Sequence, residues 1–195
     1  EIAKLIKTLH IEALGFEEEY VTYAQFSHFQ DTFSVSLVPV KNMVESLRLI
    51  KTEEEINFIK QAAQIADQAF EHILNYIKTG VKEIDVATEL EYFMRKKGAT
   101  SSSFDTIVAS GWRSALPHGV ASEKEIQTGE LVTLDYGAIY KGYVSDITRT
   151  VAVGEINDEL KQIYQIVKEA QQRGLDGIRP NITSKEADAF TRDYI

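Results

Sequence analysis

Hydrophobic residues recur at helical and then at strand spacing at the start of the chain. Ile2, Leu5, Ile6 and Leu9 lie on one face of an amphipathic helix, and the pattern after them predicts a strand, a helix and a second strand. This order is typical of an α/β domain, but so short a segment is unlikely to fold alone. We therefore interpret residues 1–48 as the C-terminal remnant of an α/β domain. The predicted elements are helices over residues 1–10 and 21–30 and strands over residues 13–16 and 33–40.

A different pattern of long amphipathic helices and separate strands occupies residues 49–195. Thr52 and Glu55 have capping-box spacing, which predicts a helix start at about residue 53. Lys141-Gly142 is a hairpin turn signal between two alternating segments. We interpret this region as a second unit of mixed α and β structure. Its predicted elements are helices over residues 53–77, 83–97 and 158–173, a helix from Thr183 onward, and strands over residues 104–109, 131–139 and 143–153.

The composition is that of an ordinary globular protein and limits the classes of function. The chain has 195 residues, of which 44% are hydrophobic and 26% are charged. Its net charge of −9 argues against nucleic acid and against an anionic membrane as partners. The lack of cysteine excludes thiolate metal sites and cysteine nucleophiles and fits a reducing cytoplasm. No apolar run approaches the roughly 18–20 residues that a membrane-spanning helix needs.

Two aspartates interrupt the apolar pattern of the predicted hairpin. Asp135 lies in the segment LDYG of one strand and Asp146 in the segment VSDIT of the other. Aspartate is disfavoured inside strands, and a buried carboxylate is costly without a partner. A two-residue turn at Lys141-Gly142 pairs Asp135 with Thr148, whereas a four-residue loop places the two aspartates directly opposite. In both registers the two carboxylates emerge on the same face.

Two anions on one face repel each other unless a cation lies between them. Arg149 is an odd number of residues from Asp146 and is therefore expected on the opposite face. Two carboxylates suit a hard or borderline divalent cation, which makes Asp135 and Asp146 candidate metal ligands. The alternative is that both aspartates flank a sheet edge and are hydrated.

His118 is the second candidate for chemistry. It lies in the segment LPHG, a loop marked by proline and glycine shortly before the aspartate hairpin. The three other histidines lie in or beside predicted helices. Loop histidines near the mouth of a sheet are more often functional than helical ones. The alternative is a turn histidine without a task.

Four motifs follow one another in the second unit: residues 103–111 (SFDTIVASG), 117–119 (PHG), 134–138 (LDYGA) and 145–150 (SDITRT). In this order and spacing they closely resemble the pita-bread metallopeptidases. The similarity is to the branch of aminopeptidase P and prolidase, which cut Xaa-Pro bonds, and it extends over residues 53–195. It implies an α+β pita-bread fold that is incomplete at the C-terminus of the chain. Residues 1–48 resemble the end of the creatinase-type N-terminal domain of that branch.

The resemblance also implies roles for individual residues. Asp135 would chelate one of two divalent metal ions, and Asp146 would bridge both. His118 would bind the substrate on the side of the scissile carbonyl and steady the tetrahedral intermediate. Phe104 falls where the family often places an aromatic residue near the substrate pocket. The ions would be Mn²⁺, with Co²⁺ or Zn²⁺ as alternatives. The family's remaining ligands, one His and two Glu, are expected beyond Ile195, so residues 1–195 alone are expected to be inactive.

The predicted function is therefore metal-dependent hydrolysis of Xaa-Pro bonds by an Xaa-Pro dipeptidase or aminopeptidase. The expected substrate is a peptide with proline in second position, and the expected protein is a cytoplasmic homodimer. Two alternatives stay open. A non-catalytic pita-bread protein would serve as a binding module. A metal-dependent phosphohydrolase is compatible with the carboxylate pair, but the net charge and the lack of an evident basic cluster near that pair argue against it.

Overall fold

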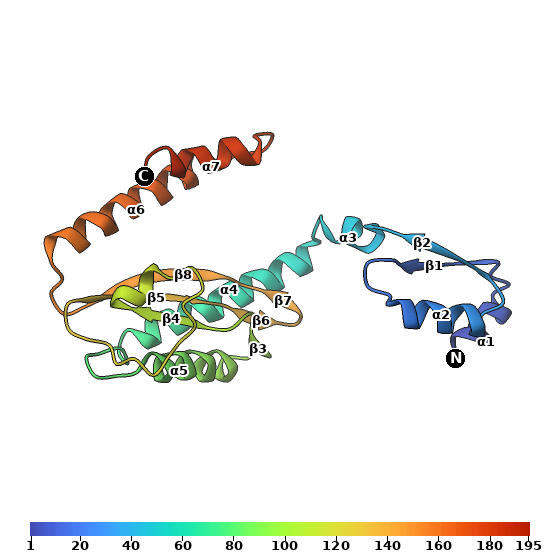
Figure 1. The fold of residues 1–195 in the computed structure, drawn as a ribbon, viewed down its shortest axis with the longest axis horizontal. Coiled ribbons are helices and arrows are strands. Elements are labelled where there is room, and N and C mark those ends of the chain that lie inside the picture. The colour runs from blue at the N-terminus through green and yellow to red at the C-terminus, as the bar shows by residue number, and fades with distance from the viewer. The chain divides into compact units, whose positions relative to one another are not determined.

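The computed structural model describes residues 1–195, which divide into two compact units, Glu1–Glu53 and Glu54–Ile195 (Figure 1). In the first unit, β1 and β2 pair in parallel, as a strand–helix–strand crossover allows. The predicted order of helix, strand, helix and strand is confirmed, and a short additional helix follows. Ile6 is the only apolar side chain of this unit that is fully buried. The elements are α1 (Ile2–Thr8), β1 (Ala13–Glu17), α2 (Tyr23–Thr32), β2 (Ser36–Val40) and α3 (Met43–Arg48).

The second unit is built on a three-stranded antiparallel sheet with the order β4-β5-β8. Helices α4 and α5 supply most of the helical side chains of its core, and Figure 1 shows α5 beside the sheet. A smaller sheet has the order β3-β6-β7. The elements are α4 (Glu53–Ile73), α5 (Glu83–Lys96), β3 (Ser101–Ser102), β4 (Ile107–Ser110), the 3₁₀-helix η1 (Gly111–Ala115), β5 (Glu130–Tyr136), β6 (Ala138–Tyr140), β7 (Tyr143–Val144), β8 (Ile147–Val153), α6 (Asp158–Gly177) and α7 (Ser184–Arg192).

The central strand β5 separates the core from a more exposed face. Val132, Leu134 and Tyr136 are buried and belong to the same cluster as the apolar residues of α4 and α5. The Tyr136 hydroxyl donates a hydrogen bond to the Ala66 carbonyl of α4 at 3.0 Å, and burial raises the pKa of this tyrosine. Because side chains alternate along a strand, Asp135 and its neighbours two residues away lie on the other face.

The hairpin register follows the two-residue turn. Lys141 and Gly142 both have positive φ, +48° and +84°, as a tight turn matched to the twist of a hairpin requires. Asp135 accordingly pairs with Thr148, and the alternative register with a four-residue loop is wrong.

The two hairpin strands predicted over residues 131–139 and 143–153 are each broken in the structure. The first breaks at Gly137 and the second at Ser145 and Asp146. A side chain at Gly137 would place its Cβ 1.9 Å from the Ser145 carbonyl oxygen, so only glycine permits this close approach. The break turns the hairpin tip into the second sheet and leaves Asp146 in a short loop at the junction.

Other element boundaries differ by a few residues from the predicted ones. Strand β4 begins at Ile107 instead of residue 104, α4 ends at Ile73 instead of 77, and α6 continues to Gly177 instead of 173. The predicted capping box at Thr183 is confirmed, because its side chain accepts from Glu186 N and the Glu186 carboxylate accepts from Thr183 N. None of the helices combines the length and the apolar character that crossing a bilayer requires.

Gly137 provides a test of this architecture. We expect Gly137→Ala to lower the free energy of unfolding by about 3 kcal/mol, the upper end of the usual cost of overpacking. The reason is that the clash is with backbone, which cannot rotate away as a side chain can. Gly142→Ala is the matched control, because it has positive φ and open space, and it should cost only about 1–2 kcal/mol. Urea unfolding measures both variants, and equal losses would contradict the role given to Gly137.

Candidate metal and substrate site

The two aspartates lie close together at the junction of the two sheets. Asp135, in β5, is half-buried and accepts a hydrogen bond from the Thr148 hydroxyl at 3.1 Å. Asp146 is exposed in the loop between β7 and β8. Burial raises the pKa of Asp135 above its ordinary value; the Thr148 hydrogen bond opposes this rise, and the neighbouring Asp146 adds to it. The pair is therefore a site of repelling negative charge that a bound cation would relieve.

Arg149, the basic residue of the neighbouring strand β8, does not neutralise this aspartate pair. Arg149 pairs with Leu134 in the β5–β8 register, so it lies on the core side of the sheet. Its guanidinium carbon is 5.9 Å from the centre of the Phe70 ring of α4, a cation–π contact. The expectation that Arg149 points away from the aspartates is confirmed.

The loop that carries His118 lies along the free edge of β4, and Gly119 approaches the face of the sheet that carries Asp135. Ile107 and Ala109 of β4 pair with Asp135 and Thr133 and so share that face. Val120 forms an isolated bridge with Ile107, and a Cβ at Gly119 would lie 3.0 Å from that of Ala109. The loop therefore packs directly on β4.

His118 itself is exposed on this loop, next to the aspartates. Its imidazole lies near enough to Asp135 that its charge lowers the pKa of this carboxyl. The structure thus brings together the three residues that the sequence singled out, Asp135, Asp146 and His118, although they come from a loop, a strand and a strand junction.

Phe104 lies just before β4 and is not part of a strand. It lies between β3 and β4, outside the strand predicted for it, and is 36% exposed. Only two residues separate it from Ile107, the β4 residue paired with Asp135.

Sequence reasoning missed a buried carboxylate beside this site. Glu83, the first residue of α5, is 0% exposed. It accepts hydrogen bonds from Ser110, Arg113 and Ser122. In sequence, Glu83 looks like any acidic residue in the first turn of a helix, and its partners lie 27 to 39 positions further along. No local pattern could have identified it.

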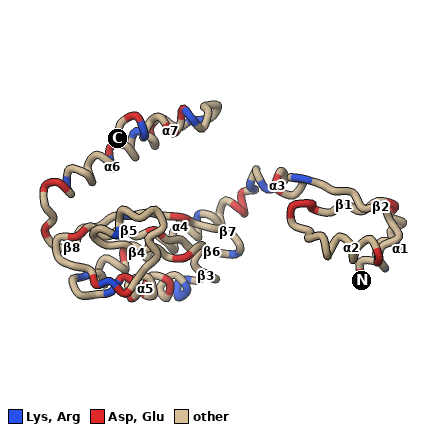
Figure 2. The backbone as a smooth tube through the Cα atoms, viewed as in Figure 1, with Lys and Arg blue, Asp and Glu red and all other residues tan.

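The donor set fits a divalent cation but is small. Carboxylate oxygens are the ligands that hard divalent cations prefer. No group of three or more His, Cys, Asp or Glu side chains forms a metal site within residues 1–195. Figure 2 shows Lys and Arg in short, scattered stretches of the tube instead of one continuous basic surface. Asp135 and Asp146 form a pair of carboxylates, one short of such a group.

Comparison with known proteins places the chain among peptidases. It is 62% identical to the solved structure of an Xaa-Pro dipeptidase from Bacillus anthracis, with a TM-score of 0.94, over 100% of this chain and 55% of that one. It is 41% identical to the X-Pro aminopeptidase from Thermotoga maritima, again with a TM-score of 0.94 over 100% and 55% of the two chains. An uncharacterized peptidase of Bacillus subtilis is 57% identical, over 99% of this chain and 55% of the relative.

Family models match both units of the chain. Residues 1–50 match the creatinase/prolidase N-terminal domain, and residues 57–195 match metallopeptidase family M24. The chain spans about half the length of the curated relatives it matches. The structural neighbours confirm the predicted α+β pita-bread fold. By its motifs, its fold and these matches, the chain belongs to metallopeptidase family M24, within the group that includes the Xaa-Pro dipeptidases.

Proposed function

We propose that the whole protein is a metallo-exopeptidase that hydrolyses Xaa-Pro bonds. The observation that carries this proposal is the Asp135–Asp146 pair with His118 close to Asp135. It is supported by the relatives, whose names are Xaa-Pro dipeptidase and X-Pro aminopeptidase. Both names describe the same bond, so the proposal covers a dipeptidase and an aminopeptidase alike.

Asp135 and Asp146 are the residues of this chain that would hold a pair of divalent metal ions; Asp135 would bind one ion, and Asp146 would be the ligand that both ions share. When bound, two such ions lower the pKa of a water molecule and polarise the scissile carbonyl. Thr148 holds Asp135 through its hydroxyl and so orients the carboxylate, as partners of metal ligands do. Mn²⁺ is the proposed native ion, because carboxylate oxygens are among its preferred ligands. Co²⁺ and Zn²⁺ are the alternatives.

His118 is the proposed catalytic residue on the substrate side. It is exposed, it lies near Asp135, and it is carried on a loop packed against β4. From there it can donate a hydrogen bond to the carbonyl oxygen as negative charge develops on it. Phe104 is the proposed aromatic wall of the pocket. An Xaa-Pro bond has no N–H and its ring is rigid, so an apolar wall can select it by shape.

The two units are proposed to have different tasks in the whole protein. Residues 1–48 are the end of the N-terminal domain, and residues 49–195 carry the first part of the catalytic domain. The proposed setting is a cytoplasmic homodimer that acts on peptides with proline in second position. A non-catalytic binding protein is the alternative that the following experiments would reveal.

The bridging role of Asp146 gives the first functional test. In the whole protein, Asp146→Ala should abolish hydrolysis of an Xaa-Pro dipeptide and lower the bound metal, while the fold survives, because the paired anions no longer need a cation. Elemental analysis and a hydrolysis assay measure both effects. Asp31→Ala, at an exposed position of α2, is the control and should leave both unchanged. Full metal content and activity in Asp146→Ala would refute the assignment.

His118 is tested by separating catalysis from metal binding. His118→Ala should lower kcat by about 10²–10³-fold, as the loss of one transition-state donor does, with metal content unchanged. His28→Ala, an exposed histidine of α2, should have no effect on either. A His118→Ala variant that loses its metal would place this histidine among the ligands instead.

A further inference from the structure

A buried carboxylate joins three segments of the chain directly behind the His118 loop. Glu83 stands at the first position of α5 with a fully buried side chain. Its Oε1 accepts from Ser110 N at 2.7 Å and Ser110 Oγ at 2.9 Å. Its Oε2 accepts from Arg113 Nε at 2.9 Å, Ser122 Oγ at 2.6 Å and Ser122 N at 3.2 Å. The carboxylate therefore bonds with residues on both sides of residues 114–121.

These donors keep Glu83 charged although it is buried. Burial raises its pKa, but the hydrogen bonds from Ser122 and Ser110 and the charge of Arg113 outweigh that effect and bring the pKa below its ordinary value. A buried anion with this many donors is costly to disturb, because removing its charge or a partner leaves the remaining groups unpaired.

Arg113 extends the network across the loop that holds His118. While its Nε donates to Glu83, its Nη2 donates to the Val120 carbonyl at 2.7 Å. Arg113, which precedes His118 in the chain, is thus bonded to Val120, which follows it. The same planar guanidinium also bonds Glu83, a geometry that lysine cannot reproduce. Within the loop, Val120 N donates to the His118 carbonyl at 2.9 Å, so the main chain of the histidine is bonded to the residue that Arg113 holds.

Lys124 adds a second layer to the same network. Its Nζ donates to Ser110 Oγ at 2.7 Å and to the Glu130 carboxylate at 2.7 and 2.9 Å. A Cβ at Gly111 would overlap the Glu130 carboxylate, so the chain passes tightly over this pair as it leaves β4. The start of the loop is therefore held as firmly as its end.

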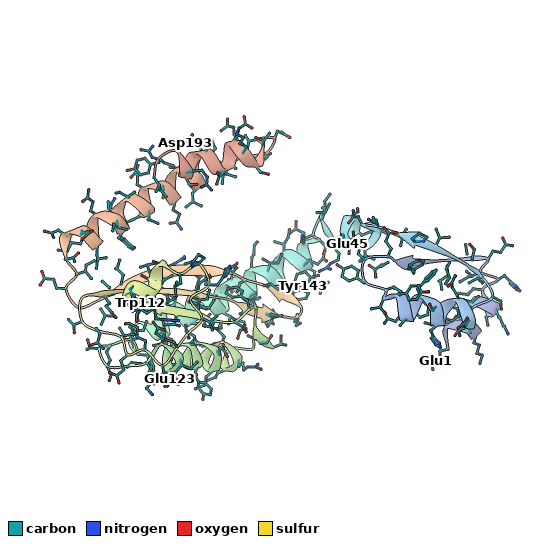
Figure 3. The ribbon with its side chains drawn as sticks, viewed as in Figure 1. Glu1, Glu45, Trp112, Glu123, Tyr143 and Asp193 are labelled. Atoms are coloured by element: carbon teal, nitrogen blue, oxygen red, sulfur yellow. The ribbon has the colours of Figure 1, made fainter.

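Few apolar side chains hold this loop in place. Helix η1 has no buried residue, and its Trp112, labelled in Figure 3, is 70% exposed. Leu116 and Val120 are also exposed, whereas Ala121 packs against the core cluster. Backbone contacts hold the end of the loop, because Val120 bridges Ile107 and Ile84 N donates to the Ser122 carbonyl at 2.9 Å. The polar contacts to Glu83 and Arg113 add a side-chain restraint on where His118 lies.

We propose that Glu83 is a positioning residue for His118: through Arg113 and Ser122 it fixes residues 111–122 so that the imidazole stays near Asp135. This inference rests on the proposed function. Glu83 touches neither substrate nor metal in this scheme, and its effect on catalysis passes through His118.

A double-mutant cycle in the whole protein tests the coupling. Glu83→Gln keeps the shape but removes the charge, and it should lower kcat by about 10²-fold, the scale of a small misplacement of a catalytic group, with bound metal unchanged. In the His118→Ala background the same change should alter kcat by less than about twofold, because coupled residues are not additive. Equal effects of Glu83→Gln in both backgrounds would overturn the inference and leave the proposed function intact.

The matched control lies on the same helix. Glu89 has a single partner, His72, whose Nε2 is 2.6 Å from its carboxylate, in contrast to the three partners of Glu83 in residues 110–122. Glu89→Gln should leave kcat unchanged, both in the wild-type background and in the His118→Ala background. A loss of kcat in Glu89→Gln equal to that in Glu83→Gln would show a general loss of helix stability and overturn the specific role.

Hydrogen exchange tests the positioning without relying on activity. In Glu83→Gln, amides of residues 112–121 should exchange faster than in the wild type, while those of residues 130–136 stay protected; Glu89→Gln should change neither. Unaltered exchange over residues 112–121 would overturn the inference. If the wild type hydrolyses no Xaa-Pro peptide, the proposed function fails, and this measurement still decides whether Glu83 holds the loop.

A milder variant covers the case in which Glu83→Gln does not fold. Ser122→Ala removes one donor at 2.6 Å and keeps the backbone bond, so it should raise exchange in residues 112–121 to a smaller extent. Thr88→Ala is its control, since the Thr88 hydroxyl donates only to Ile84 O within α5. Faster exchange with Thr88→Ala and none with Ser122→Ala would contradict the proposal.

Discussion

The antiparallel register of β5 and β8 is the constraint on which the site depends. The tight turn at Lys141-Gly142 pairs Asp135 with Thr148 and puts Arg149 on the core side. A slip of β8 by one residue against β5 would turn the side chains of β8 to the opposite faces, taking Thr148 into the core and Arg149 to the site. One turn conformation thus decides which side of the sheet carries negative charge and which side is apolar.

Two kinds of carboxylate lie within this unit, and their surroundings separate their roles. Glu83 is fully buried with five hydrogen bonds, so its charge is compensated by the chain itself. Asp135 is half-buried, has one hydroxyl donor and faces another aspartate. The first arrangement stabilises a fixed geometry, whereas the second leaves negative charge available for an external cation.

Most of the fold could be predicted from local pattern. The helices and strands occur in the predicted order, the capping box at Thr183 is present, and the hairpin turn lies where expected. The errors have local physical causes. The strand through Gly137 breaks because that glycine allows a carbonyl to approach where any side chain would clash. The strand predicted from residue 104 begins only at Ile107, because the sheet pairing starts opposite Asp135.

The sequence by itself determined the types of element, the shared face of Asp135 and Asp146, and the loop character of His118, since all three follow from side-chain periodicity and turn residues. Only the tertiary structure decided between the two hairpin registers, brought the His118 loop to the edge of β4 and buried Glu83 between the two ends of that loop. The reason is distance along the chain: Glu83 meets partners 27, 30 and 39 positions away, and hydrogen bonds of that span leave no periodic trace in the sequence.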